Sequence, residues 1–294
     1  MDFSIIGREI KILRSELGIS QAELSDGICT QSQISKIEKG EVYPLANTLY
    51  FIAERLGVDV NYFYDLATNP RLSYVKEVIS QVRDLLVKCD YKEVYKIVEA
   101  EKKNSLFINN RKYKQFLLWS EGICIFHLKN DKNASLKLLR EALELTKMTS
   151  KLLGEREVEI LNSIAIIYSE TSCYMDAIKT YDEALVHYIK ISYIHDPTIK
   201  TKLLYNKAKS LTRLKRLEES ISTCKEGVRW CIKHNNMYLL GDIYYHLGYN
   251  YSLRDDNLLA IEHFKKSIDI FILQEDQTFV KHIKEKIEEL KVKL

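Results

Sequence analysis

The chain has 294 residues, 46% of them hydrophobic and 29% charged, with only 3 Pro and 10 Gly, a composition that favours an all-α protein longer than one ordinary domain. Charges interrupt the apolar positions of the N-terminus and no stretch approaches a membrane span, so we expect a cytoplasmic protein without signal peptide or membrane contact. The six cysteines include no C-x-x-C pair, and the seven histidines are scattered singly. We therefore expect reduced thiols, no metal, no cofactor and no enzymatic activity.

The first predicted helix lies close to the N-terminus. Apolar residues at helical spacing precede Gly18, namely Ile5, Ile6, Ile10, Leu13 and Leu17. Ser20 with Glu23 and Thr30 with Gln33 then form two capping boxes, which predict the starts of two short helices. Two further helices are expected between Pro44 and residue 66.

Net charge argues against nucleic-acid binding by this segment. Residues 1–66 hold six Lys or Arg against ten Asp or Glu, so their net charge is −4 although the whole chain carries +3. A DNA-binding function must therefore depend on a local arrangement of side chains and not on bulk charge.

The sequence of residues 1–66 resembles the Xre-type helix-turn-helix of phage repressors. The runs ISQAELS, TQSQISKIEKG and LGVDVNYFYD carry the resemblance, although the turn over residues 27–30 is shorter than usual. In that family the second helix of the pair enters the major groove, and the first contacts phosphate at its N-terminus. The resemblance implies DNA contacts by Gln21, Thr30, Gln31, Ser32, Ser35, Lys36 and Lys39. It also implies a structural ion pair between Arg14 and Glu38, where two separate surface charges are the alternative.

From residue 72 the chain repeats itself. Small or aromatic residues recur at the offsets of a tetratricopeptide repeat, most clearly at Ala165, Tyr168, Tyr174, Ala177, Tyr181 and Ala184. Five such frames, spaced 40 to 43 residues apart, predict a solenoid over 72–276 with a capping helix at 277–294. Residues 67–71, which include Pro70, are the expected hinge.

The first helices of the repeats are expected to line the concave side of the solenoid. Their outward positions predict a peptide-binding groove made of Arg83, Trp119, Ile123, Phe126, Glu159, Asn162, Ile166, Tyr205, Asn206, Lys209, Asp242, Tyr245 and Tyr249. Aromatic stripes on helices are more often core than site, so packing is an equally good interpretation of Trp119 and Phe126.

A helix-turn-helix fused to five long repeats resembles the RNPP family, the peptide-sensing regulators of Gram-positive bacteria. The resemblance implies a transcription regulator, an activator by preference, that binds a palindromic operator as a homodimer and responds to a short re-imported signalling peptide in quorum sensing. It also implies that Asn162 and Asn206 hold the peptide backbone. Basic residues and a glutamine found in the family are here Val87, Cys89 and Asp242, which implies a different peptide.

Two alternatives remain at this point. One is a repeat protein that mainly sequesters a protein partner, as the Rap members of this group do. The other is a redox-responsive regulator that uses Cys224 and Cys231, seven residues apart on one helical face. Because the repeat frame places Cys224 at a normally buried offset, we expect it in the core.

Overall fold

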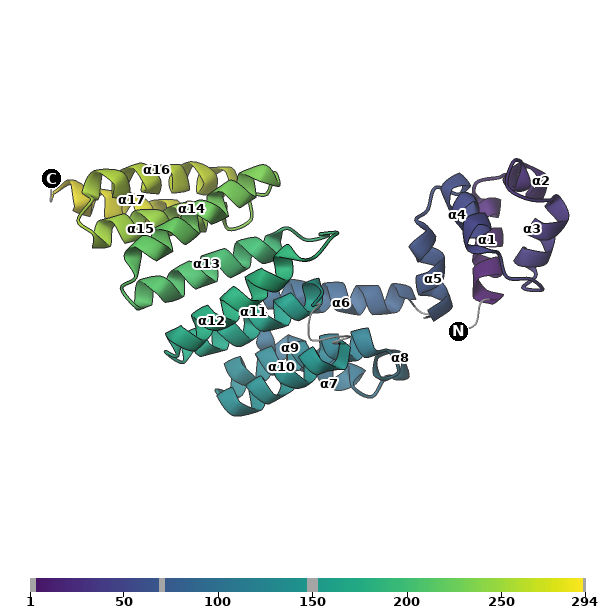
Figure 1. The fold of residues 1–294 in the computed structure, drawn as a ribbon, viewed down its shortest axis with the longest axis horizontal. Coiled ribbons are helices and arrows are strands. Elements are labelled where there is room, and N and C mark those ends of the chain that lie inside the picture. The colour runs from purple at the N-terminus through teal and green to yellow at the C-terminus, as the bar shows by residue number, and fades with distance from the viewer. Residues whose placement is uncertain (1–3, 69–71, 147–152, 293–294) are drawn as a thin grey trace. The chain divides into compact units, whose positions relative to one another are not determined.

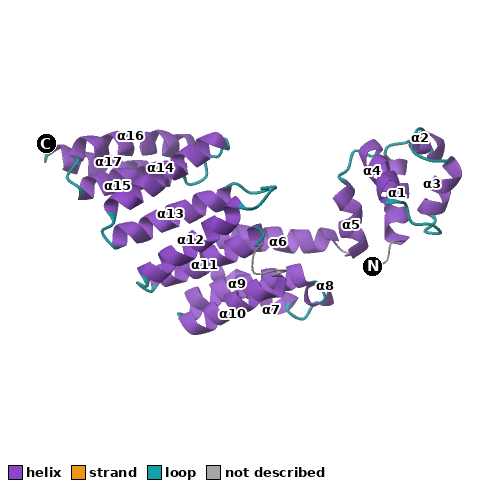
Figure 2. Ribbon diagram, viewed as in Figure 1, coloured by secondary structure: helices purple, strands orange, loops and turns teal. Residues whose placement is uncertain are grey.

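The computed structural model describes residues 4–68, 72–146 and 153–292, and within these ranges every regular element is an α-helix (Figures 1 and 2). This confirms the all-α prediction. None of the helices in these ranges is long and apolar enough to cross a membrane. The chain divides into two compact units, Met1–Asp90 with Glu99–Asn110, and Tyr91–Val98 with Arg111–Leu294.

The first unit begins with the predicted helix-turn-helix. Its helices are α1 (Ser4–Glu16), α2 (Gln21–Ser25), α3 (Gln31–Glu38), α4 (Ala46–Arg55), α5 (Val60–Thr68), α6 (Leu72–Val87) and α8 (Ser105–Ile108). Helix α7 (Tyr91–Glu101) is shared between the two units. Of the predicted hinge at 67–71, the first two residues end α5, and residues 69–71 lie outside the described ranges.

Capping and one glycine fix the start of the helix-turn-helix. Ser20 and Thr30 both form the predicted capping boxes, each with the side chain and backbone of the residue three positions later. At Gly7, helix α1 passes so close to α3 that an added Cβ would lie 1.9 Å from the carbonyl oxygen of Ile37. Only glycine allows this crossing, which brings Ile6 and Ile10 into one core with Ile34.

The second unit is a stack of helical hairpins (Figure 1). The pairs are α9 (Arg111–Lys129) with α10 (Lys132–Thr146), α11 (Glu155–Glu170) with α12 (Tyr174–Ile189), α13 (Thr198–Arg213) with α14 (Leu217–Lys233), and α15 (Leu240–Leu253) with α16 (Asn257–Leu273). Helix α17 (Gln277–Lys291) packs on α16 and covers the last pair. The sequence analysis expects a capping helix over 277–294, and α17 lies within this range.

Small residues let the two helices of a hairpin approach closely. At Gly248 on α15, an added Cβ would lie 2.6 Å from the ring of Phe264 on α16. Ala260, also on α16, is fully buried beside this contact. These are positions at which the sequence repeat requires a small or aromatic side chain, so the packing explains the repeat pattern.

The first helices of successive hairpins also contact one another. Helix α11 lies against α9 and α13, and α13 lies against α15. The predicted groove residues other than Arg83 lie on these four first helices.

Candidate functional site

Helix α3 presents a polar face. Ile34 and Ile37 are buried in the helix-turn-helix core, whereas Gln31, Ser32 and Lys36 are exposed. Ser35 is half-buried, and the flanking Thr30 and Lys39 are exposed at the two ends of the helix. The residues predicted to contact DNA on α3 are thus on its accessible side. Amide, hydroxyl and ammonium groups of this kind can hydrogen-bond to base edges and phosphates.

A chain of hydrogen bonds holds the first of these side chains in place. Gln31 donates from Nε2 to Oε1 of Gln21 at 2.8 Å, and Gln21 donates from its own Nε2 to Oε2 of Glu38 at 2.9 Å. Gln21 therefore joins the start of α2 to both ends of α3. Sequence reasoning assigned Gln21 a phosphate contact but did not find its link to Gln31.

The ion pair between Arg14 and Glu38 completes this chain and confirms the prediction. The guanidinium donates to the two carboxylate oxygens at 2.6 and 3.1 Å, and it also donates to the carbonyl of Ile19 at 2.7 Å. The Glu38 side chain is 2% exposed. The hydrogen bond to Glu38 raises the pKa of Arg14, so the guanidinium stays charged.

The two asparagines of the predicted groove meet across adjacent repeats. Asn206 on α13 donates from Nδ2 to Oδ1 of Asn162 on α11 at 3.3 Å. Among the described residues no partner contacts Nδ2 of Asn162 or Oδ1 of Asn206, so the pair keeps one donor and one acceptor. An extended peptide backbone offers the complementary acceptor and donor.

The other predicted groove residues differ in accessibility. Lys209 is exposed, and the half-buried members are Ile123, Ile166, Tyr205, Asp242, Tyr245 and Tyr249. Burial raises the pKa of Asp242, while Lys209 opposes this effect. Arg83 is half-buried on α6 and belongs to the first unit.

Four predicted groove residues are largely covered by protein, and Asn162 is one of them at 9% exposed. Trp119 is 8% exposed and donates from Nε1 to Oγ of Ser163 on α11 at 2.9 Å. Phe126 and Glu159 are buried to a similar extent, and Glu159 pairs with Arg156 at 3.0 Å. Trp119 and Phe126 mainly pack α9 into the stack, which agrees with the packing interpretation of these two aromatics.

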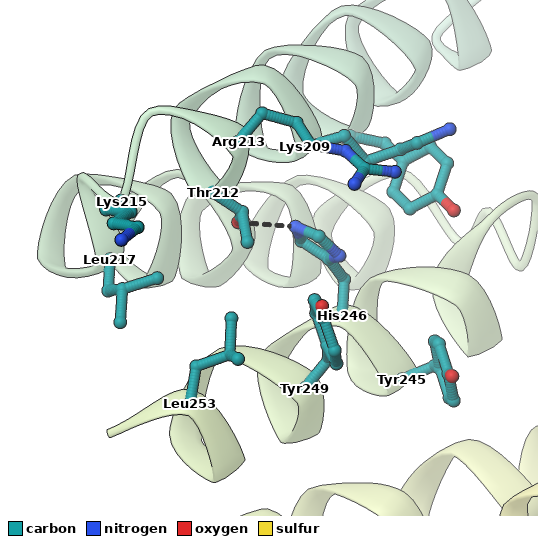
Figure 3. A pocket seen from close by; sticks show the side chains of 10 residues that line it. Lys209, Thr212, Arg213, Lys215, Leu217, Tyr245, His246, Tyr249 and Leu253 are labelled. Carbon is teal, nitrogen blue, oxygen red and sulfur yellow. Dashed lines mark hydrogen bonds between the residues drawn. The ribbon is translucent and has the colours of Figure 1, made fainter.

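A pocket of about 590 Å³ lies between α13 and α15 (Figure 3). Besides predicted groove residues it is lined by six that sequence reasoning missed, Thr212, Arg213, Lys215, Leu217, His246 and Leu253. Arg213 follows Lys209 by one helical turn, and this spacing is a signal that would have found it.

Cys224 and Cys231 lie in the core. They are 1% and 0% exposed, as the repeat offset of Cys224 predicts. Burial raises the pKa of the Cys224 thiol to about 12 and also raises that of Cys231. Thiols in this state contain little thiolate and react slowly, so the geometry does not favour the redox alternative.

Two family models match the chain. A model described as the RNPP family C-terminal domain matches residues 80–291, and a model described as a helix-turn-helix domain matches residues 7–68. No curated protein matches the chain.

Solved structures of similar fold cover nearly the whole chain. Bacillus thuringiensis PlcR in complex with the peptide PapR7 and DNA is 27% identical, with a TM-score of 0.84 over 95% of this chain and 99% of that one. The apo form of B. thuringiensis PlcR is 26% identical, with a TM-score of 0.68 over 96% and 98%. ComR from S. thermophilus, in complex with DNA and its signalling peptide ComS, shares the fold at 16% identity, with a TM-score of 0.65 over 97% and 99%.

The family model for the C-terminal domain covers most of the chain and coincides with the hairpin stack, while the helix-turn-helix model coincides with α1 to α5. The chain therefore belongs to the RNPP family of peptide-sensing helix-turn-helix regulators.

Proposed function

We propose that this protein is a transcriptional activator that binds a palindromic operator as a homodimer and is controlled by a short signalling peptide, re-imported into the cell and bound in the repeat groove. The observation that carries the proposal is the Asn162–Asn206 pair, which joins two repeats and keeps one donor and one acceptor. The resemblance to PlcR, solved with a peptide and DNA, supports both kinds of ligand.

The proposed DNA contacts are those of α3 and the start of α2, through Gln21, Thr30, Gln31, Ser32, Ser35, Lys36 and Lys39. The chain of hydrogen bonds from Glu38 through Gln21 fixes the orientation of Gln31 before DNA arrives, which lowers the entropic cost of a base contact. Because residues 1–66 are net acidic, one copy should bind weakly. Two copies on a two-fold symmetric site double the number of contacts, which is the basis for proposing a homodimer.

The proposed peptide lies extended along the first helices of the repeats. Asn162 and Asn206 hold its backbone without regard to sequence, and Tyr205, Tyr245 and Tyr249 grip its apolar side chains. Binding across several repeats would favour one curvature of the stack, and this bias is the proposed route to the DNA-binding unit. We propose a regulatory and non-catalytic function in the cytoplasm, where the proposed DNA target would be found.

Sequestration of a protein partner is the weaker alternative, because the helix-turn-helix keeps its core, both capping boxes and an exposed polar face on α3. A pure partner-binding protein has no need for that face.

Operator selection with the full chain tests the proposal. Random duplex DNA is bound and amplified over several rounds, with and without a pool of random heptapeptides. We expect one palindromic motif to emerge and its recovery to depend on the peptide pool. Recovery of no motif under either condition would contradict the proposal, and a motif without two-fold symmetry would contradict the dimer.

A further inference from the structure

The pocket between α13 and α15 has two chemically different walls (Figure 3). Lys209, Arg213 and Lys215, from α13 and the turn that follows it, form the basic wall. The apolar wall is formed by tyrosines and leucines from α15 and the start of α14, namely Leu217, Tyr245, Tyr249 and Leu253. The volume of about 590 Å³ lies within the range of ligand-binding sites and is ample for one large side chain.

None of the three cations of the basic wall forms an ion pair with a carboxylate among the described residues, and Lys209 acts on Asp242 only through a longer-range electrostatic interaction. The Nζ of Lys209 lies 5.3 Å from the centre of the Tyr205 ring. This cation–π contact positions the ammonium group but leaves its positive charge uncompensated. Neighbouring cations behave differently. Lys207 pairs with Asp182 at 2.5 Å, and Arg216 pairs with Glu219 at 2.6 Å.

The floor of the pocket is polar and uncharged, and hydrogen bonds join its side chains. His246 is 8% exposed, and Thr212 Oγ1 lies 2.9 Å from its Nε2. Thr212 also donates to Oδ1 of Asn250 at 2.7 Å, and Asn250 donates to Oγ of Ser220 at 2.8 Å. Burial, with Lys209 and Arg213 nearby, lowers the pKa of His246 to about 4, so the ring is neutral near pH 7.

No Asp or Glu lines this pocket, and the carboxyl of Asp242 lies outside the lining but close enough to Lys209 for Lys209 to lower its pKa. An inorganic anion would use the basic wall and leave the tyrosines and leucines in contact with water. A purely apolar side chain would use the opposite wall and leave the cations unpaired. A residue that carries both a carboxylate and a large apolar group satisfies both walls.

We infer that this pocket is the subsite that selects the effector peptide by a carboxylate next to a large apolar side chain, with Lys209 and Arg213 holding the carboxylate and Tyr245, Tyr249 and Leu253 covering the side chain. The inference rests on the proposed function, since it assumes a peptide ligand. The carboxylate has two chemical sources, the C-terminus of the peptide or an internal Asp or Glu, and the experiment separates them.

The experiment is affinity selection with mass-spectrometric readout on the full chain. The probes are three random heptapeptide pools, one with free C-termini and no Asp or Glu, one identical but C-terminally amidated, and one amidated that contains Asp and Glu. The variant is Lys209→Gln/Arg213→Gln. The matched control is Lys225→Gln/Arg229→Gln, which removes the same charges at the same spacing from exposed positions on α14, outside the pocket.

We expect the wild type to retain carboxylate-bearing peptides roughly tenfold or more over the amidated, acid-free pool. Aromatic or large aliphatic residues should be enriched beside the carboxylate. Enrichment from the free-acid pool identifies the C-terminus as the source, and enrichment from the amidated Asp and Glu pool identifies a side chain. The Lys209→Gln/Arg213→Gln variant should retain all pools equally, and the α14 control should behave like the wild type.

The experiment gives different results if this inference is wrong and if the proposed function is wrong. Peptides retained without preference for a carboxylate, or a preference that survives Lys209→Gln/Arg213→Gln, would overturn the inference and leave a peptide-binding groove. If the wild type retains no peptide from any pool, both proposals are wrong.

Discussion

Asn206 donates a hydrogen bond to Asn162 across the boundary between two repeats, at 3.3 Å between Nδ2 and Oδ1. This pairing fixes both carboxamides in one orientation. We therefore expect Asn162→Ala and Asn206→Ala each to weaken peptide binding by about 1 to 2 kcal/mol. The probe is a peptide recovered from the random heptapeptide pools, and its affinity is measured by fluorescence anisotropy.

The matched control for these variants is Ser169→Ala. Ser169 on α11 pairs with Ser210 on α13 at 3.0 Å, so it joins the same two helices without an amide. If Ser169→Ala binds the peptide like the wild type while the asparagine variants lose affinity, the effect belongs to the carboxamides. Equal loss in all three variants would mean that the asparagines act only through helix packing.

The exposed face of α3 should determine operator affinity. We expect Gln31→Ala to cost about 1 to 3 kcal/mol and to relax selection at one base position, the behaviour of a base contact. Lys36→Ala should also weaken binding and reduce the salt dependence, as a lost phosphate contact does. The control is Lys11→Ala, which removes the same charge from an exposed position on α1. If the operator affinity of Lys36→Ala depends on salt concentration in the same way as that of Lys11→Ala, Lys36 does not contact DNA.

The buried ion pair should stabilise the helix-turn-helix. Arg14→Ala leaves the Glu38 carboxylate buried with Gln21 as its remaining side-chain partner, so we expect the free energy of unfolding to fall by about 3 kcal/mol. Denaturant unfolding followed by circular dichroism measures this loss. Arg8→Ala, an exposed arginine on the same helix, is the control and should change stability little. Similar losses in the two variants would show that the pair contributes nothing specific.

His246 should make the repeat unit sensitive to acid. Its pKa is about 4 in the folded protein and about 6.5 when unfolded, so the unfolded chain takes up the proton first as pH falls. Stability should decline between about pH 6.5 and 4, by at most about 3 kcal/mol, and His246→Asn should lose this part of the pH dependence. His195→Asn, at an exposed position, is the control. A wild-type pH profile in His246→Asn would refute the assignment.

Thiol labelling should follow burial. We expect Cys89, which is exposed, and Cys173, whose pKa is lowered by hydrogen bonds from Lys132 and Thr171, to react readily in native protein. Cys224 and Cys231 should react only on unfolding, as mapped by mass spectrometry of alkylated peptides. Rapid native labelling of Cys224 and Cys231 that also alters operator binding would restore the redox alternative.

The sequence predicted those features that depend on local spacing. Ser20 and Thr30 form their capping boxes because each partner lies three residues away. The repeat offsets predicted the hairpins because small residues are required where helices cross. A short helix, α8, was missed, although Asn104 caps it by accepting from the backbone of Leu106.

The details of the groove could not be predicted in the same way. Outward positions were counted on single helices, but Trp119 is covered because its indole reaches Ser163 on the next repeat. The pocket was missed since it combines Arg213 on α13 with Tyr249 on α15 and Leu217 at the start of α14. Such combinations depend on how neighbouring repeats pack, which spacing within one helix does not describe.

Coupling between the peptide and the operator is the most direct test. Operator affinity of the full chain is measured by fluorescence anisotropy on the selected duplex, with and without the selected peptide. We predict that the peptide changes wild-type affinity by about 5- to 150-fold, while Asn162→Ala/Asn206→Ala binds operator like the peptide-free wild type and does not respond. An operator affinity that the peptide leaves unchanged in the wild type, or changes equally in the double variant, would contradict the account.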